Sequence, residues 1–348
     1  LMEPSDHLDS WSMLEATAGL AEQVEVAAEA AREVDLSGLP ARDQIENVLV
    51  LGMGGSGVSG DLLTVAAGPF LPVPVVVVKG YEPPSYANEN TLVFAMSFSG
   101  DTEETVDAVT TAALAGAPVV AVTRGGEVAR LAESWQAPII PVADGIPAPR
   151  AGLGAMAVPP LIVLERLGLF PGAGEWVHRG VEQLKRRRDA LLRPGGDAEL
   201  LARRLGRTVP LVYGGGGIGQ VAAARWKTQV NENAKAPAFA NTVPELCHNE
   251  IAGWGQHGDL TRQVFSLVQL RHGHEHPQVM KRFELVTRWT EEVVSGVHEV
   301  RAEGEGALAQ LLDLVLFGDF VSLHLAFQEG VDPGPVPVLD EIKAALQA

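Results

Sequence analysis

The chain contains little cysteine and little positive charge. Cys247 is the only cysteine among 348 residues, which excludes an internal disulfide and fits a reducing compartment. Lys and Arg total 26 against 44 Asp and Glu, so the net charge at pH 7 is −18. Because no basic stripe is present to neutralise a row of phosphates, we expect no nucleic-acid partner. An anion site in this chain must be a local one.

Long apolar runs are also missing. The longest nearly apolar stretch, residues 151–164, contains two consecutive prolines and is too short to cross a bilayer. Residues 1–6 show neither the basic nor the apolar region of a secretory signal. We therefore expect a cytoplasmic protein that does not contact a membrane.

What the chain does have is an alternation of short apolar runs with helical patterns, which predicts an α/β fold with doubly wound parallel sheets. Residues 8–35 and 155–192 also show helical spacing. In the first half, strands are predicted at 47–51, 74–78, 91–96, 118–122 and 138–141, and helices at 57–66, 103–115 and 126–134.

The second half repeats this theme. The strand-like run at 209–213 leads into a second series of glycines, and Gly52 aligns with Gly214. Further strands are expected near 236–240 and 264–270, with helices near 220–232, 277–294 and 307–328. The sequence thus predicts an internal duplication. The predicted parts are a helical arm (1–40), a first domain (41–154), connecting helices (155–195) and a second domain (196–348).

The first glycine-rich stretch, residues 48–60, reads as a buried strand, a tight turn and the start of a helix. Such a turn can receive an anion at the helix N-terminus, although a turn without a ligand is the plainer alternative. Its glycine spacing matches a dinucleotide-binding fingerprint, which also requires an acidic residue after the second strand. That position is Lys79, which suits a phosphate better than a ribose and disfavours an NAD-dependent oxidoreductase.

Three hydroxyl groups surround the end of the third strand. Ser97, Ser99 and Thr102 lie where parallel sheets bind ligands, and Ser56 follows the neighbouring strand. Hydroxyls with free helix-start amides form a phosphate cradle. The alternative is helix capping by Ser99 or Asp101, which leaves Ser97 without a role.

These residues carry a family resemblance. Gly54-Gly-Ser-Gly57 and Ser97-x-Ser-Gly-x-Thr-x-Glu-Thr105 resemble the sugar isomerase (SIS) signature. The chain also resembles the bifunctional phosphoglucose/phosphomannose isomerases, in order along residues 45–345. The motifs that carry this second resemblance are Pro149-Arg150-Ala-Gly-Leu-Gly154, Asn231-Glu232-Asn-Ala-Lys235, Glu245-Leu-Cys-His248-Asn249-Glu250 and Pro335-Val-Pro-Val-x-x-x-Ile-Lys343.

The resemblance implies an aldose–ketose isomerase that moves a proton between C2 and C1 of a hexose 6-phosphate through an enediolate, without a metal or other cofactor. Glu232 would be the base, His248 would act at the ring oxygen, Lys343 would assist ring opening and Arg150 would stabilise the enediolate. The implied phosphate ligands are Gly55, Ser56, Ser97, Ser99 and Thr102. The family further implies a homodimer whose histidine crosses the interface. Taken singly, each catalytic candidate fits an ordinary surface or core role, and only the ordered set argues otherwise.

Three positions depart from the family pattern as we know it. Asp101, Ala234 and Cys247 stand where Asn, Ser and Asn are common. Asp101 adds negative charge beside the proposed phosphate unless its side chain points away. These departures keep a second hypothesis open, a sugar-phosphate-binding regulatory SIS protein without catalysis.

A possible metal pattern lies outside these motifs. His272, His274 and His276 alternate along a predicted loop with no acidic or cysteine cluster beside them. We expect structural or surface histidines rather than a metal site.

Overall fold

The computed structural model describes residues 8–346, which fold into two compact units. The N-terminal unit contains Gly19–Arg186 and Glu303–Asp313. The C-terminal unit contains Arg187–Ala302 together with the described residues of Leu1–Ala18 and Leu314–Ala348. The boundaries predicted at residues 40, 154 and 195 stay predictions.

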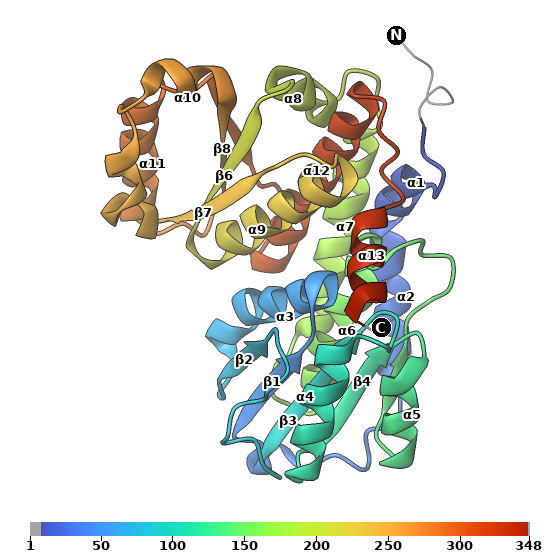
Figure 1. The fold of residues 1–348 in the computed structure, drawn as a ribbon. Helices are drawn as coiled ribbons and strands as arrows, with labels where there is room; N and C mark the ends of the chain where they lie inside the picture. The colour runs from blue at the N-terminus through green and yellow to red at the C-terminus, as the bar shows by residue number, and fades with distance from the viewer. Residues whose placement is uncertain (1–7, 347–348) are drawn as a thin grey trace. The chain divides into compact units, whose positions relative to one another are not determined.

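A five-stranded sheet forms the centre of the N-terminal unit (Figure 1). All its pairings are parallel, in the order β2-β1-β3-β4-β5. The strands are β1 (Asn47–Leu51), β2 (Val75–Val78), β3 (Thr91–Ser97), β4 (Val119–Thr123) and β5 (Ile139–Pro141). Every residue of β3 and β4 is buried, as expected for central strands covered on both faces. Strand β2 lies on one side of β1, whereas β3, β4 and β5 follow on the other side, so the strand order reverses at β1 and β3.

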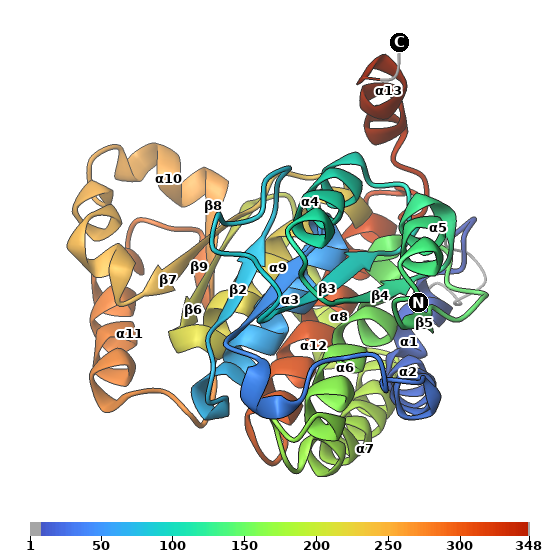
Figure 2. The ribbon, with the colours of Figure 1, turned by 90° about the horizontal axis from the view of Figure 1, so that it is seen from below.

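Helices cover both faces of this sheet. On one face α3 and α2 pack against α6, and on the other α4 and α5 pack over an apolar cluster from β1, β3 and β4 (Figure 2). The helices of this unit are α2 (Leu20–Glu33), α3 (Gly54–Ala66), α4 (Glu103–Leu114), α5 (Gly126–Ser134), α6 (Leu153–Arg166) and most of α7 (Ala173–Leu191). Short 3-10 turns are η2 (Arg42–Gln44), η3 (Gly68–Phe70) and η4 (Pro149–Ala151).

The C-terminal unit repeats the arrangement with four parallel strands in the order β7-β6-β8-β9. They are β6 (Val209–Gly215), β7 (Phe239–Val243), β8 (Phe265–Arg271) and β9 (Gly296–Arg301). Counted within each unit, both sheets place their first four strands in the order 2-1-3-4. This shared order, with a glycine-rich start after the first strand of each, confirms the predicted duplication and fold class.

Helices of the C-terminal unit lie on both sides of its sheet. Phe283 and Val286 of α11 pack on Leu211 and Tyr213 of β6, while α9 is fixed to α12 by a buried ion pair of Arg225 with Asp319 at 2.9 Å. The helices are α1 (Met13–Ala18), α8 (Asp197–Leu205), α9 (Gly216–Asn233), α10 (Gly258–Val264), α11 (Pro277–Thr290), most of α12 (Ala307–Gln328) and α13 (Pro337–Leu346), with the turns η5 (Glu245–His248) and η6 (Glu250–Gly253).

Several predicted elements differ from the structure. The strand predicted near 236–240 is β7 at Phe239–Val243, and β9 was not predicted because its side chains are mostly half-exposed or exposed and form no apolar run. The helical stretch 155–192 is two helices, since Gly168 and Gly172 between them have positive φ angles of 75° and 90°. Helix α3 begins at Gly54 rather than at 57, because the glycines themselves form its first turn.

Contrary to the expectation that long apolar runs are missing, helix α12 has the length and apolarity that a membrane span would need. However, 89% of its most apolar window is buried inside the protein, which is the pattern of a core helix.

Candidate functional site

The loops after β1 and β3 form the candidate ligand site of the N-terminal unit. These strands are adjacent, with Leu51 opposite Ala95, and the chain leaves them toward opposite edges of the sheet. Such a switch point opens a crevice at the carboxyl ends of the strands, where α/β proteins bind ligands. Helices α3 and α4 both begin there, so the first-turn amides of both helices are near the same place.

Glycine is required where these loops approach each other. A Cβ on Gly52 would lie 2.8 Å from the carbonyl oxygen of Met96, at the end of β3. A Cβ on Gly57 would lie 2.7 Å from the carbonyl oxygen of Gly52. Glycine therefore allows a close approach at these two positions, and what approaches is the protein's own backbone.

The predicted phosphate-binding hydroxyls form a connected set. The Ser56 hydroxyl accepts a hydrogen bond from the Phe98 amide at 3.3 Å, which joins the loop after β1 to the loop after β3. Ser97 donates to Thr102 at 3.1 Å and accepts from the Gly100 amide at 3.0 Å. Both serines are buried, with exposed fractions of 6% and 0%. The structure thus brings Ser56, Ser97 and Thr102 to one end of the sheet.

Helix capping does not account for this arrangement. The N-cap residue of α4 is Thr102, and among the described residues its side chain makes no capping hydrogen bond. The predicted alternative, an N-cap at Ser99 or Asp101, is therefore wrong for α4. The Ser99 hydroxyl instead accepts from the Asp101 amide at 3.2 Å, within the turn.

The carboxylate of Asp101 faces a different helix. Its Oδ1 accepts a hydrogen bond from the Glu127 amide at 2.9 Å, in the first turn of α5. Gly126 makes room for it, since a Cβ there would lie 2.6 Å from the same oxygen. The added negative charge is thus stabilised by the N-terminus of α5.

Several cations lie near the loops, and two of them bear on the predicted site. Arg150 is 5% exposed within η4, and a Cβ on Gly55 would approach its Cα to 3.6 Å, which places η4 against the first turn of α3. Lys79 passes beside Gly57 and pairs with Asp61 of α3. The charge of Lys79 is therefore already balanced by a carboxylate, a partner that its position in the sequence did not suggest.

The remaining predicted catalytic residues belong to the C-terminal unit. Glu232 lies in the last turn of α9, His248 ends the turn η5, and Lys343 lies in α13. The structure thus assigns the predicted phosphate ligands and Arg150 to one unit and these three side chains to the other.

Glu250 fixes the loop around His248. In the sequence motif that contains both residues, Glu250 had no predicted role. Glu250 accepts hydrogen bonds from the Tyr213 hydroxyl on β6 and from the side-chain amide of Asn241 on β7. Burial, followed by the hydrogen bond and the charge of Glu250, raises the pKa of Tyr213 far above its ordinary value, so the phenol stays a neutral donor. The only sign of this role in the sequence was that Glu250 belongs to the same motif as His248.

The other two departures from the family pattern are structurally mild. Ala234 is 8% exposed and caps the C-terminus of α9. Cys247 is half-buried against the apolar cluster of β6 and α11, and burial raises the pKa of its thiol. A raised pKa disfavours the thiolate, which is the nucleophilic form of cysteine.

The three alternating histidines each have a structural partner. His272 Nε2 lies 2.6 Å from the Gly215 carbonyl, and its Nδ1 accepts from the His274 amide at 3.2 Å. His276 is the N-cap of α11 and accepts from the Gln278 amide. Among the described residues, no group of three or more histidine, cysteine or acidic side chains is arranged to hold a metal ion.

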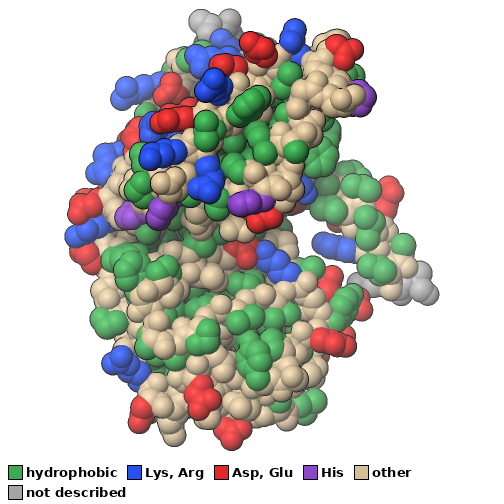
Figure 3. Space-filling view, turned by 90° about the vertical axis from the view of Figure 1, so that its left-hand side faces the viewer, with side chains coloured by type: hydrophobic (Ala, Val, Ile, Leu, Met, Phe, Trp, Pro, Cys, Tyr) green, Lys and Arg blue, Asp and Glu red, His purple; other side chains and the backbone are tan. Residues whose placement is uncertain are grey.

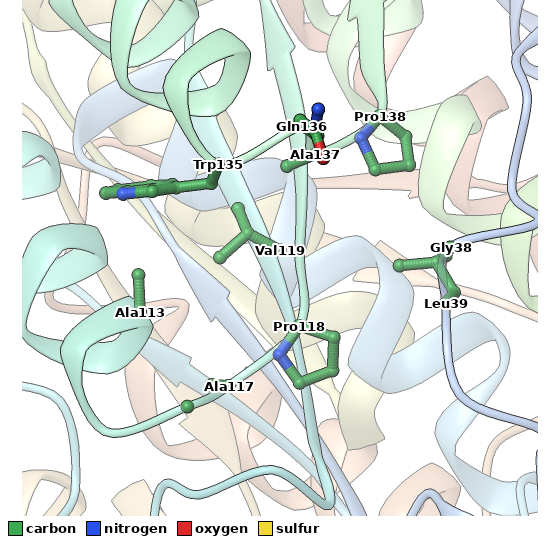
Figure 4. A pocket seen from close by; sticks show the side chains of 11 residues that line it. Gly38, Leu39, Ala113, Ala117, Pro118, Val119, Trp135, Gln136, Ala137 and Pro138 are labelled. Atoms are coloured by element: carbon green, nitrogen blue, oxygen red, sulfur yellow. The ribbon is translucent and has the colours of Figure 1, made fainter.

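A hollow of about 310 Å³ lies at the other end of the N-terminal sheet (Figure 4). Near the starts of β4 and β5 it is lined by Pro118, Val119, Trp135 and Pro138. The side chains of its lining that can donate a hydrogen bond are those of Trp135 and Gln136. It contains no acid, base or nucleophile and carries no catalytic proposal.

Comparison with known proteins adds independent information. Residues 195–346 match the bacterial phospho-glucose isomerase C-terminal SIS domain family, and residues 43–142 match the SIS domain family. A bifunctional phosphoglucose/phosphomannose isomerase of Caldicellulosiruptor bescii is 34% identical over 96% of this chain and 98% of its own length. One from Aquifex aeolicus is 32% identical over 87% and 91%.

Solved structures share the fold. The C-terminal domain of glucosamine-fructose-6-phosphate aminotransferase from Francisella tularensis matches with a TM-score of 0.72 at 15% identity, over 93% of this chain and 98% of that one. A glucose-6-phosphate isomerase like protein from Thermus thermophilus matches with a TM-score of 0.58 at 21% identity, over 93% and 96%. At these identities the likeness concerns the fold alone.

Proposed function

The chain belongs to the family of bifunctional phosphoglucose/phosphomannose isomerases, and we propose that it is an aldose–ketose isomerase that converts glucose 6-phosphate and mannose 6-phosphate to fructose 6-phosphate. The observation that carries this proposal is the similarity to the isomerase of Caldicellulosiruptor bescii, which extends over 96% of the chain. The sugar-phosphate substrate follows from the same relatives.

The phosphate end of the substrate would bind at the switch point of the N-terminal unit. Ser56, Ser97, Ser99 and Thr102 would supply hydroxyl donors there, with the Ser97 proton turning from Thr102 to the phosphate. The first turns of α3 and α4, including Gly55, would supply amides. Positive helix ends and neutral donors bind a dianion without a dedicated lysine. The bonds that already join Ser56 to Phe98 and Ser97 to Thr102 support a cradle that is formed before the ligand arrives.

The chemical step would use the side chains of the C-terminal unit together with Arg150. Glu232 would remove the proton from C2 of the aldose and return it to C1, with the pair of electrons held meanwhile in the enediolate, while the hydroxyl proton on O2 moves to O1. His248 and Lys343 would assist ring opening at the ring oxygen, and the guanidinium of Arg150 would stabilise the enediolate oxygen. No step in this route requires a metal or another cofactor.

We further propose a cytoplasmic homodimer in which His248 reaches the active site of the partner subunit. This assembly is the expectation of the family resemblance. It predicts that the sites depend on subunit contact.

A coupled assay with purified protein and each hexose 6-phosphate tests the proposal. Wild type is expected to turn over, and Glu232→Gln is expected to lower kcat by about 10²- to 10⁴-fold, the usual contribution of a general base. Turnover unaffected by Glu232→Gln would remove that residue from the mechanism. Tight binding of the sugar phosphates by calorimetry without turnover would instead favour the regulatory alternative.

A further inference from the structure

Lys235 directly follows the end of the helix that carries Glu232, in an unusual conformation. Helix α9 ends at Asn233 with Ala234 as its C-cap, and Lys235 then has a φ angle of +53°. Glycine is the usual residue at this position, because a side chain with a Cβ is strained there. Something in the surrounding structure must hold a lysine in this conformation.

The ammonium group of Lys235 shows what holds it. Its Nζ donates to the carbonyl oxygens of Glu232 at 2.8 Å and Asn233 at 3.4 Å, which end α9. It also donates to the carbonyls of Asp332 at 2.8 Å and Pro333 at 3.1 Å. A cation is favoured at a helix C-terminus, where the unpaired carbonyls carry partial negative charge. The bonds to Asp332 and Pro333 span 97 and 98 residues of the sequence. One side chain therefore connects two segments that are distant along the chain.

The second segment is fixed from its other side as well. Oδ1 of Asp332 accepts from the Ser10 amide at 3.3 Å and the Gly334 amide at 3.0 Å. Gly334 packs so closely on Trp11 that a Cβ there would lie 2.8 Å from the indole ring. Only three residues after Gly334, Pro337 begins α13, the helix that contains Lys343. The α13 side chains themselves are exposed, so its attachment to the unit depends on the segment before it.

We propose that Lys235 is a positioning residue, which ties the C-terminus of α9 to residues 332–334 and so holds Glu232 and the base of α13 in a fixed relation. We call the four hydrogen bonds of the Lys235 ammonium the clamp. The clamp consists of contacts within the C-terminal unit, whereas the roles of Glu232 and Lys343 rest on the proposed function. Lys235 is exposed and contributes nothing to an apolar core, so its loss loosens this junction without unfolding the unit.

The test compares two substitutions with a matched control. Lys235→Asn tolerates a positive φ angle but removes the ammonium, whereas Lys235→Arg keeps a cation with several donors. The control is Lys281→Asn, the same change at an exposed lysine of α11. We expect Lys235→Asn to lower kcat at least tenfold with KM for the sugar phosphate within threefold, because the phosphate ligands lie in the other unit. We expect Lys235→Arg to recover at least a third of the wild-type kcat, and the control to behave as wild type.

Hydrogen exchange separates this inference from the proposed function. In Lys235→Asn, peptides covering 231–236 and 329–337 should exchange faster than in wild type, with the rest of the chain unchanged. Unchanged exchange in both peptides would overturn the clamp even if the enzyme is active. Faster exchange with normal kcat would show a clamp that positions nothing and would also overturn the proposal. A wild type that fails to isomerise any hexose 6-phosphate contradicts the proposed function, while the exchange result still decides the clamp.

Discussion

The hydroxyl groups at the switch point are held in place by the protein itself. The amide of Phe98 fixes Ser56, and the amide of Gly100 fixes Ser97. A hydroxyl that accepts one of these bonds can still donate its own proton, so Ser56 can bind an anion without giving up its partner. Ordered hydroxyls bind with a smaller entropic cost than mobile ones.

Ser56→Ala tests this arrangement. We expect KM for the sugar phosphate to rise at least tenfold with kcat within threefold, since a hydrogen bond to a charged group contributes about 1.5–3 kcal/mol. Ser59→Ala is the matched control on the same helix, because Ser59 is also buried but its hydroxyl lies 3.5 Å from the Gly55 carbonyl of its own helix. Steady-state kinetics of both variants decide the matter, and equal effects would argue against a role for Ser56 in phosphate binding.

Asp101 makes a second prediction at this scale. Asp101→Asn keeps an oxygen for the Glu127 amide but removes the negative charge at the N-terminus of α5, so we expect a loss of stability of about 0.3–1 kcal/mol. We also expect a KM lower by about two- to fivefold, the effect of one exposed charge. Asp101→Ala removes the bond to α5 and should destabilise the protein by about 1 kcal/mol. Urea unfolding and kinetics of the two variants check these expectations. A higher KM for Asp101→Asn would mean that the carboxylate helps substrate binding.

At the scale of single elements, the two glycine-rich helix starts have different neighbours. In the N-terminal unit α3 starts beside hydroxyl groups, whereas in the C-terminal unit α9 starts beside His272, whose ring contacts the Gly215 carbonyl. Since Nδ1 of His272 accepts an amide proton, Nε2 must carry the hydrogen that it donates to Gly215. The duplicated turn thus uses an internal histidine where the first turn offers serine.

This histidine should make stability depend on pH. Burial lowers the pKa of His272 below its usual 6.5, although the Gly215 bond and Glu275 oppose the shift. A lowered folded-state pKa gives stability that is fully present above pH 6.5 and is lost as the pH falls through the folded-state value. We expect wild type to lose more stability than His272→Gln between pH 7.5 and 5, measured by urea unfolding. The same loss in both proteins would show that His272 does not titrate on unfolding.

At the scale of the whole molecule, the net negative charge coexists with basic side chains. On the face drawn in Figure 3, acidic and basic side chains are interspersed. The net charge of −18 is compatible with a local site for an anion, because the proposed cradle uses helix ends and hydroxyls at the carboxyl ends of β1 and β3.

The proposed assembly makes its own prediction. Glu232→Gln and His248→Ala should each be nearly inactive alone. If His248 serves the partner's site, co-refolding equal amounts of both should restore about a quarter of wild-type activity, since half of the dimers are mixed and each has one intact site. Mixing without refolding, where subunits do not exchange, is the control. No recovery in a mixture that is dimeric by light scattering would place both groups in the same subunit.

Much of this fold could be read from the order of residues. Short buried strands with glycine-rich turns predicted both parallel sheets, because a strand covered on both faces must be apolar along its whole length. The polar edge strand β9 could not be predicted, since its side chains give no periodic signal. The predicted ligands Ser56, Ser97 and Thr102 do meet at one end of a sheet, because parallel strands bring their carboxyl ends to the same edge.

The sequence by itself determined the duplicated α/β architecture and the family, since both depend on local patterns and on motifs in a fixed order. Only the tertiary structure decided the direction of the Asp101 carboxylate and the partners of Lys79, Lys235 and Glu250. The reason is physical. Long polar side chains have many rotamers, and which carbonyl or carboxylate they reach is set by segments that are distant in sequence and adjacent only after folding.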